Sequence, residues 1–168
     1  MLPPSVFDPF VVPRSSLTIY KFKEPEVSHN WNGHDIVISS HEIEHIHVKY
    51  PDHRHYDCEA MAVDPFNADI LLFTKNHEHH ESKVFKVPHG SGDPKTLEEV
   101  VTLPYKLVTG ADISPSGDTL ALTNYGEGWS WSKPDALPWA EFLKTGPTPC
   151  SLRLKQEVQR EAITVTDR

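Results

Sequence analysis

An internal repeat constrains the fold of this chain more than any other feature of its sequence. Residues 59–65 (EAMAVDP) resemble residues 110–115 (GADISP), and residues 161–165 (EAITV) resemble the start of the first copy. The prolines that end the first two copies lie 50 residues apart, and the glutamates that begin the first and third copies lie 102 residues apart. Each of the first two copies is followed by an acidic residue and an apolar run ending in threonine, at 69–74 and 118–123. The chain is therefore predicted to consist of similar units of about 50 residues.

Each unit is predicted to hold four β-strands, because apolar and polar residues alternate with a period of two along most of the chain. Turn sequences such as 64–67 (DPFN) and 114–117 (SPSG) separate the alternating runs. The expected strands are 58–64, 69–75, 82–88 and 97–103 in the first unit and 108–114, 118–124, 128–132 and 150–154 in the second. The continuous apolar centre of 69–75 predicts a buried strand. Fifteen prolines argue against a mostly helical protein, and four strands per repeat of this length are typical of a β-propeller blade.

The flanking sequence is predicted to supply parts of two further blades. Strands at 17–23 and 42–49 would be outer strands of a preceding blade, and 159–166 would be the innermost strand of the next one. Propellers close with about four to eight blades. We therefore expect residues 17–168 to form a partial, all-β propeller domain with complete blades at 58–103 and 108–154, after an irregular segment at 1–16. The alternative is a small β-sandwich whose strands resemble each other by chance.

One short helix is expected near 135–144, inserted before the last strand of the second blade. Trp139, Phe142 and Leu143 would form its apolar stripe, Pro138 suits its first turn, and Gly146-Pro147 lies just beyond its end.

Several runs of this sequence resemble a family of WD40-like and phytase-like β-propeller proteins that are known mainly by their fold. The similar stretches are 57–65 (DCEAMAVDP), 71–75 (LLFTK), 84–88 (VFKVP), 108–117 (VTGADISPSG), 120–125 (LALTNY) and 159–163 (QREAI). The resemblance spans roughly residues 17–166 and implies the propeller fold. It implies little about function, because the Trp-Glu-Asp and Gly-Asp-Asn motifs of the family's further blades do not occur here.

Four acidic residues are candidates for a site at the mouth of the propeller channel. Asp57, Glu59, Asp112 and Glu161 fall on or beside the innermost strands of the expected blades. Carboxylates grouped there would suit Ca²⁺ or Mg²⁺, which prefer oxygen ligands, and a phytase-like propeller would assemble its metal and phosphate site in this way. The alternative is that these acids bind amides of neighbouring strands and fix the register between blades.

Eleven histidines are unusually many for this length, and three of them lie close together in the hairpin loop 76–81 (NHEHHE). His77, His79 and His80 could bind Zn²⁺ or Cu²⁺. A polar loop without a cysteine and without fixed geometry is more often solvated.

Composition and charge exclude some classes of partner. The formal net charge of −8 argues against binding nucleic acid or an anionic membrane surface. No secretion signal is recognisable and no apolar run approaches the roughly 18 residues of a membrane span. As written, the chain is expected to be soluble and cytoplasmic, and secretion stays open if coding sequence precedes it.

Two hypotheses about function follow. The first is a non-catalytic propeller module that offers a binding surface to a partner protein or ligand, with self-association possible through exposed strand edges. The second is a fragment of a phytase-like hydrolase that uses Ca²⁺ to bind a phosphate ester and activate water. The first is favoured because no Gly-x-Ser-x-Gly or Gly-rich phosphate loop occurs. Cys58, inside an expected strand, is predicted to be a buried, inert thiol.

Overall fold

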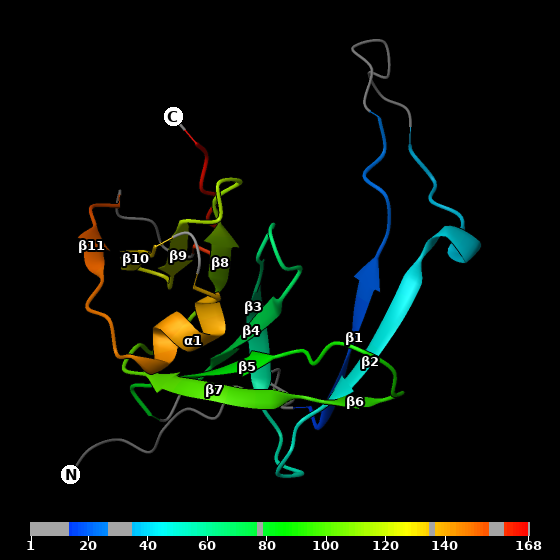
Figure 1. Cartoon of the computed structure of the whole chain (residues 1–168), viewed down its shortest axis with the longest axis horizontal. Coiled ribbons are helices and arrows are strands. Elements are labelled where there is room, and N and C mark those ends of the chain that lie inside the picture. Colours follow the sequence, from blue (N-terminus) through cyan, green and yellow to red (C-terminus); the bar gives the residue numbers. More distant parts are fainter. Residues whose placement is uncertain (1–13, 27–34, 77–78, 135–136, 155–159, 168) are drawn as a thin grey trace, which may run out of the picture.

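The structure of this chain, a computed structural model, is all-β apart from short helical turns. It describes residues 14–26, 35–76, 79–134, 137–154 and 160–167. In these residues eleven strands form three small sheets, which stand side by side with a four-stranded sheet in the middle (Figure 1).

The central sheet is an antiparallel meander in the order β3-β4-β5-β7. Its strands are β3 (Asp57–Val63), β4 (Ile70–Lys75), β5 (Ser82–Lys86) and β7 (Glu98–Leu103). They match the four strands predicted for the first unit to within one or two residues at most ends. β4 is buried on both faces, as its continuous apolar run predicts.

The second four-stranded sheet repeats this topology with the order β8-β9-β10-β11. It consists of β8 (Gly110–Ile113), β9 (Thr119–Thr123), β10 (Gly128–Ser132) and β11 (Cys150–Leu152). Again each strand lies inside its predicted range, and all neighbours are antiparallel. The sequence repeat therefore corresponds to two sheets of one design.

The third sheet is formed by β1 (Ser16–Lys21), β2 (Glu44–Lys49) and the two-residue strand β6 (Lys95–Thr96). β1 and β2 pair antiparallel, as expected for two outer strands of one unit. β6 pairs parallel to β2, and the apolar periodicity of the sequence predicts no strand at these two residues. A 3₁₀ turn (Ser40–Glu42) precedes β2.

The first hairpin turn of each four-stranded sheet is closed by the same hydrogen bond. The amide of Asp64 donates to the carbonyl of Asp69 at 2.9 Å, and the amide of Ser114, 50 positions later, donates to that of Thr119 at 2.8 Å. The two turns also touch, since a Cβ on Gly117 would lie 2.5 Å from the ring of Phe66. Gly117 has a φ of +68°, so both its backbone and this contact require glycine.

Two clusters of apolar side chains cover the two faces of the central sheet. On one face Ala60, Ala62, Leu71 and Phe73 pack against the β8–β11 sheet. On the other face Leu72 and Phe85 pack with Val48 and the buried Tyr50 of the β1–β2 side. The middle sheet is thus held between two neighbours, and burial on both faces explains the apolar runs in its strands.

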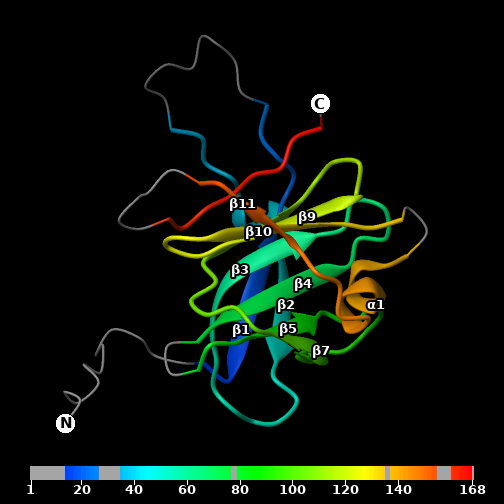
Figure 2. The same cartoon turned by 90° about the vertical axis from the view of Figure 1, so that its left-hand side faces the viewer.

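The helix is shorter than the sequence pattern predicts. α1 (Trp139–Lys144) lies beside β7 in both views (Figures 1 and 2) and buries Trp139, Ala140 and Leu143. Pro138, expected inside the first turn, is instead the extended N-cap residue, and its carbonyl accepts the first helical hydrogen bond from the amide of Phe142 at 3.0 Å. Residues 135–136 lie outside the described part of the chain.

The structure also differs from the prediction of an innermost strand at 159–166. Residues 160–167 run beside β8 but carry no strand ladder, and residue 159 is not described. Their contacts are made through side chains instead. The hydroxyl of Thr109 donates to the carbonyl of Arg160 at 2.6 Å, and Ser116 donates through its hydroxyl to Asp167 at 2.7 Å. A strand ladder needs a second strand beside this segment, and the described residues supply none.

Candidate functional site

Glu59 is engaged by a buried lysine at the end of the sheets where β3 begins. The ammonium of Lys75, at the end of β4, donates to Oε2 of Glu59 at 2.7 Å. It also lies 5.0 Å from the ring centroid of Tyr125, which follows β9 in the neighbouring sheet. The side chain of Lys75 is 6 % exposed and that of Glu59 is 34 % exposed. The ion pair therefore joins β3 and β4 within the central sheet, and the contact of Lys75 with Tyr125 reaches the neighbouring sheet.

The pKa of Lys75 reflects this environment. Burial alone lowers it, but the hydrogen bonds and negative charge supplied by Glu59, with a contribution from Tyr125, outweigh burial and raise the pKa above its usual 10.5. Lys75 is therefore a permanent cation at neutral pH, and Glu59 is its counter-ion.

Asp112 binds a backbone amide. Its Oδ2 accepts a hydrogen bond of 2.8 Å from the amide of Val165, so it joins β8 to the segment 160–167. Asp57 lies half-buried at the start of β3, opposite Lys75 in the strand register, and Glu161 is exposed. The four predicted acids do not converge on one point. No group of three or more His, Cys, Asp or Glu side chains within the described ranges is placed to hold a metal ion.

The histidine loop is described only in part. His79 and His80 are exposed, whereas His77 lies outside the described residues. The amide of His79 donates to Oδ1 of Asn76 at 3.0 Å, which is an ordinary loop contact.

An apolar groove lies between the β1–β2 sheet and the central sheet. It has a volume of about 510 Å³. Its apolar lining comes from β1, β2, β3 and the start of β4: Ile19, Ile46, Met61, Val63 and Ile70. Met61 is 45 % exposed and Val63 is 44 % exposed, although both lie in strand β3 of the central sheet. Apolar side chains that stay open in such a place are typical of an interaction surface.

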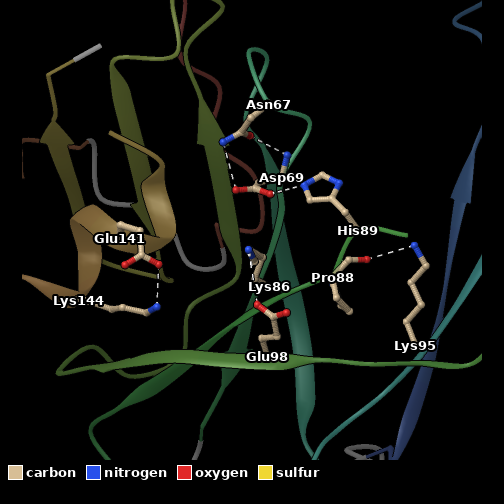
Figure 3. A network of polar contacts seen from close by, with 9 residues as sticks. All are labelled: Asn67, Asp69, Lys86, Pro88, His89, Lys95, Glu98, Glu141 and Lys144. Atoms are coloured by element: carbon tan, nitrogen blue, oxygen red, sulfur yellow. Dashed lines mark hydrogen bonds and ion pairs between the residues drawn. The ribbon is translucent and has the colours of Figure 1, made fainter. Parts of the chain in front are cut away.

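A polar network lies at the rim of this groove (Figure 3). Oδ1 of the buried Asp69 lies 2.6 Å from Nε2 of His89. Asn67 holds Asp69 in place, because its side-chain amide donates to Oδ2 at 3.1 Å and its Oδ1 accepts the Asp69 amide at 2.8 Å. Lys95 donates to the carbonyl of Pro88 at 3.1 Å. The rim therefore presents an oriented imidazole and an ammonium beside an apolar floor.

We expect only one of the two cysteines to react in the native protein. Burial raises the pKa of the Cys58 thiol to about 12, and Cys150 is exposed. A disulfide reagent that reports released thiolate should titrate Cys150 quickly at neutral pH and Cys58 only in denaturant. Cys150→Ser should remove the fast phase, and fast reaction of both thiols in the native protein would contradict the raised pKa of the half-buried Cys58 thiol.

Glu59→Gln is expected to lower the free energy of unfolding by about 2 kcal/mol, because the buried ammonium of Lys75 loses its counter-charge. The raised pKa of Lys75 stabilises the fold at all pH values below the usual 10.5, and this contribution is lost as pH rises through the folded-state pKa. The difference between wild type and variant should therefore be constant near neutrality and shrink above pH 10.5 in urea titrations.

Glu44→Gln is the matched control, since Glu44 forms an exposed pair with Lys21 at 2.9 Å. It should change stability very little. Equal effects of the two substitutions would contradict the buried character of the Glu59–Lys75 pair.

Comparisons with known proteins leave the family unassigned: no protein-family model, curated protein or solved structure matches this chain. The resemblance to WD40-like and phytase-like propellers therefore stays a prediction. None of the described helices is long and apolar enough to span a membrane.

Sequence reasoning missed Lys75, Tyr125 and the pair Asp69–His89. Lys75 and Tyr125 occupy the same position of the repeat, 50 residues apart, and this correspondence could have drawn attention to them. The groove could also have been anticipated from the sequence. Both faces of the strand residues 60–63 (AMAV) are apolar, and each face needs apolar residues packed against it.

Proposed function

We propose that this chain is a non-catalytic binding module built from propeller-type blades, with the groove over β3 as its binding surface. The blade assignment is supported by two meander sheets of the same topology and by the equivalent turns at 64–69 and 114–119. The observation that carries the binding role is the groove itself, with Met61 and Val63 open on its floor.

The contacts of the predicted acids support a non-catalytic role. A Ca²⁺ site needs several carboxylates aimed at one ion. Glu59 instead binds Lys75, and Asp112 binds the amide of Val165. The Asp112 contact is of the register-fixing kind that formed the alternative for these acids, whereas the Glu59–Lys75 pair joins two strands of one sheet. Both carboxylates are thus already engaged by groups of the chain itself.

A fluorescent dye that binds exposed apolar surface, anilinonaphthalene sulfonate, tests the binding surface directly. The native protein should bind the dye at low protein concentration, and Met61→Asp should weaken this binding several-fold because it places a charge on the groove floor. Val37→Asp is the control, since Val37 is 87 % exposed and lies outside this groove. Dye binding that is absent, or unchanged in Met61→Asp, would contradict the proposed surface.

Hydrolysis of a phosphate monoester, measured with and without added Ca²⁺, separates this proposal from the phytase-like alternative. We expect no turnover above the uncatalysed rate in either condition. Calcium-dependent turnover that disappears in Glu59→Gln would overturn the non-catalytic reading and support the hydrolase.

A further inference from the structure

The contact between the two four-stranded sheets uses alternate residues of β3. Ala60 and Ala62 point toward the β8–β11 sheet and are buried in the shared core with Ala111 and Ile113 of β8. By the offset of 50, Ala111 and Ile113 are equivalent to Met61 and Val63. One repeat thus packs its even-numbered positions on the odd-numbered positions of the next repeat.

The third copy of the repeat, residues 161–165, packs on β8 in the way that β8 packs on β3. A Cβ on Gly110 would lie 3.1 Å from Cα of Ala162, and Asp112 binds the amide of Val165. Ile163 and Val165, which correspond to Met61 and Val63, are accordingly half-buried.

Two faces of this packing series are left open in the described residues. At one end Met61 and Val63 of β3 are exposed, although their equivalents in the second and third copies are buried or half-buried. At the other end Ala162 and Thr164 are exposed, although their equivalents Ala60 and Ala62 are buried. The two open faces are therefore the two complementary halves of an interface that the chain already forms within itself.

The backbone segments beside these two open faces are complementary as well. β1 is an edge strand of the β1–β2–β6 sheet, with no strand on its free side in the described part of the chain. Residues 160–167 are an extended segment without a ladder of their own. Lys21 and Lys95 line the groove between β1 and β3, where Lys21 pairs with Glu44 and Lys95 donates to the carbonyl of Pro88. The C-terminal segment carries the exposed carboxylates of Glu161 and Asp167, which the ammonium of Lys95 would attract.

We propose that two copies of this chain associate head to tail, with residues 161–165 of one copy seated on the Met61–Val63 face of the other. This inference rests on the proposed function, because it names the occupant of the groove. Such an interface is heterologous: each copy contributes a different surface, and both surfaces stay available at the ends of a pair. Association should therefore increase with concentration and depend on both faces.

Sedimentation velocity of the full chain over a wide range of concentration tests this association. The wild type should pass from monomer to larger species as concentration rises. Met61→Asp and Thr164→Asp should each remain monomeric, and since both side chains are exposed, circular dichroism and the unfolding midpoint should stay close to wild type. Val37→Asp should associate like the wild type.

Mixing the two monomeric variants distinguishes head-to-tail contact from other kinds of association. The Met61→Asp chain keeps an intact 161–165 face, and the Thr164→Asp chain keeps an intact β3 face. The mixture should therefore form a one-to-one dimer and stop there, because the remaining pair of faces brings two carboxylates together. Failure of the mixture to dimerise, or association of either variant alone as in the wild type, would refute the head-to-tail arrangement.

The dye experiment keeps the two proposals distinguishable. A wild type that is monomeric at every concentration but binds dye in a Met61-dependent way would overturn the self-association and leave the proposed binding surface standing. If both proposals hold, dye bound per chain should decrease as the wild type associates, while Thr164→Asp should bind the dye undiminished at all concentrations.

Discussion

Phe73→Ala should lower the free energy of unfolding by about 3–5 kcal/mol, because it opens a large cavity between the two four-stranded sheets. Phe73 lies in β4, is fully buried and belongs to the core cluster that includes Leu120, Leu122 and Trp129 of the other sheet. The substitution therefore removes contacts on both sides of the sheet interface.

Tryptophan fluorescence makes this experiment a test of coupling between the sheets. Trp129, Trp131 and Trp139 all belong to the second unit, and with Trp31→Phe as background they supply the whole signal. A substitution in the first sheet should shift the urea transition reported by the second. Phe66→Ala is the matched control, since Phe66 is 68 % exposed and should change stability by less than about 1 kcal/mol. An unshifted fluorescence transition in Phe73→Ala would mean that the two sheets unfold independently.

Trp139→Ala is the second substitution expected to have a large effect. Trp139 anchors α1, is fully buried, and donates through its indole nitrogen to the carbonyl of Gly117 at 3.0 Å. Its removal should lower the free energy of unfolding by about 3–5 kcal/mol, from the lost apolar burial and the unsatisfied carbonyl.

Trp139→Phe separates these two causes. It keeps most of the ring but removes the indole donor, so we expect a loss of about 1–2 kcal/mol. Urea unfolding followed by circular dichroism compares the two variants with Glu141→Ala, an exposed position on the same helix. Similar stability of Trp139→Ala and Glu141→Ala would show that the helix does not depend on this anchor.

The strands of both four-stranded sheets were predictable because their apolar periodicity is local. The turn sequences at 64–67 and 114–117 reinforced the pattern and placed the boundaries well. β6 was missed because a two-residue strand is defined by its partner β2, far away in sequence, rather than by its own residues. Residues 160–167 have the composition of an inner strand but not its hydrogen bonds, which depend on a neighbouring strand.

The candidate site was predictable only in part. The acids at 57, 59, 112 and 161 could be located from the repeat, but their partners could not. The pairing of Glu59 with Lys75 depends on the β3–β4 register, which shifts between Cys58 and Ala60, and no sequence pattern reveals such a shift. The binding groove depends on which face of β3 is covered, and this is a property of packing between sheets.

Nuclear Overhauser contacts between equivalent positions of neighbouring repeats test the stacking of the two four-stranded sheets directly. We predict cross-peaks from the Gly117 α-protons to the Phe66 ring and from the methyl groups of Ala60 and Ala62 to Ile113, in the isolated full chain. The Gly117 α-protons should also be shifted by the ring current of Phe66. Cross-peaks confined to each sheet, with Gly117 at ordinary chemical shifts, would contradict the face-to-face stacking of the two units.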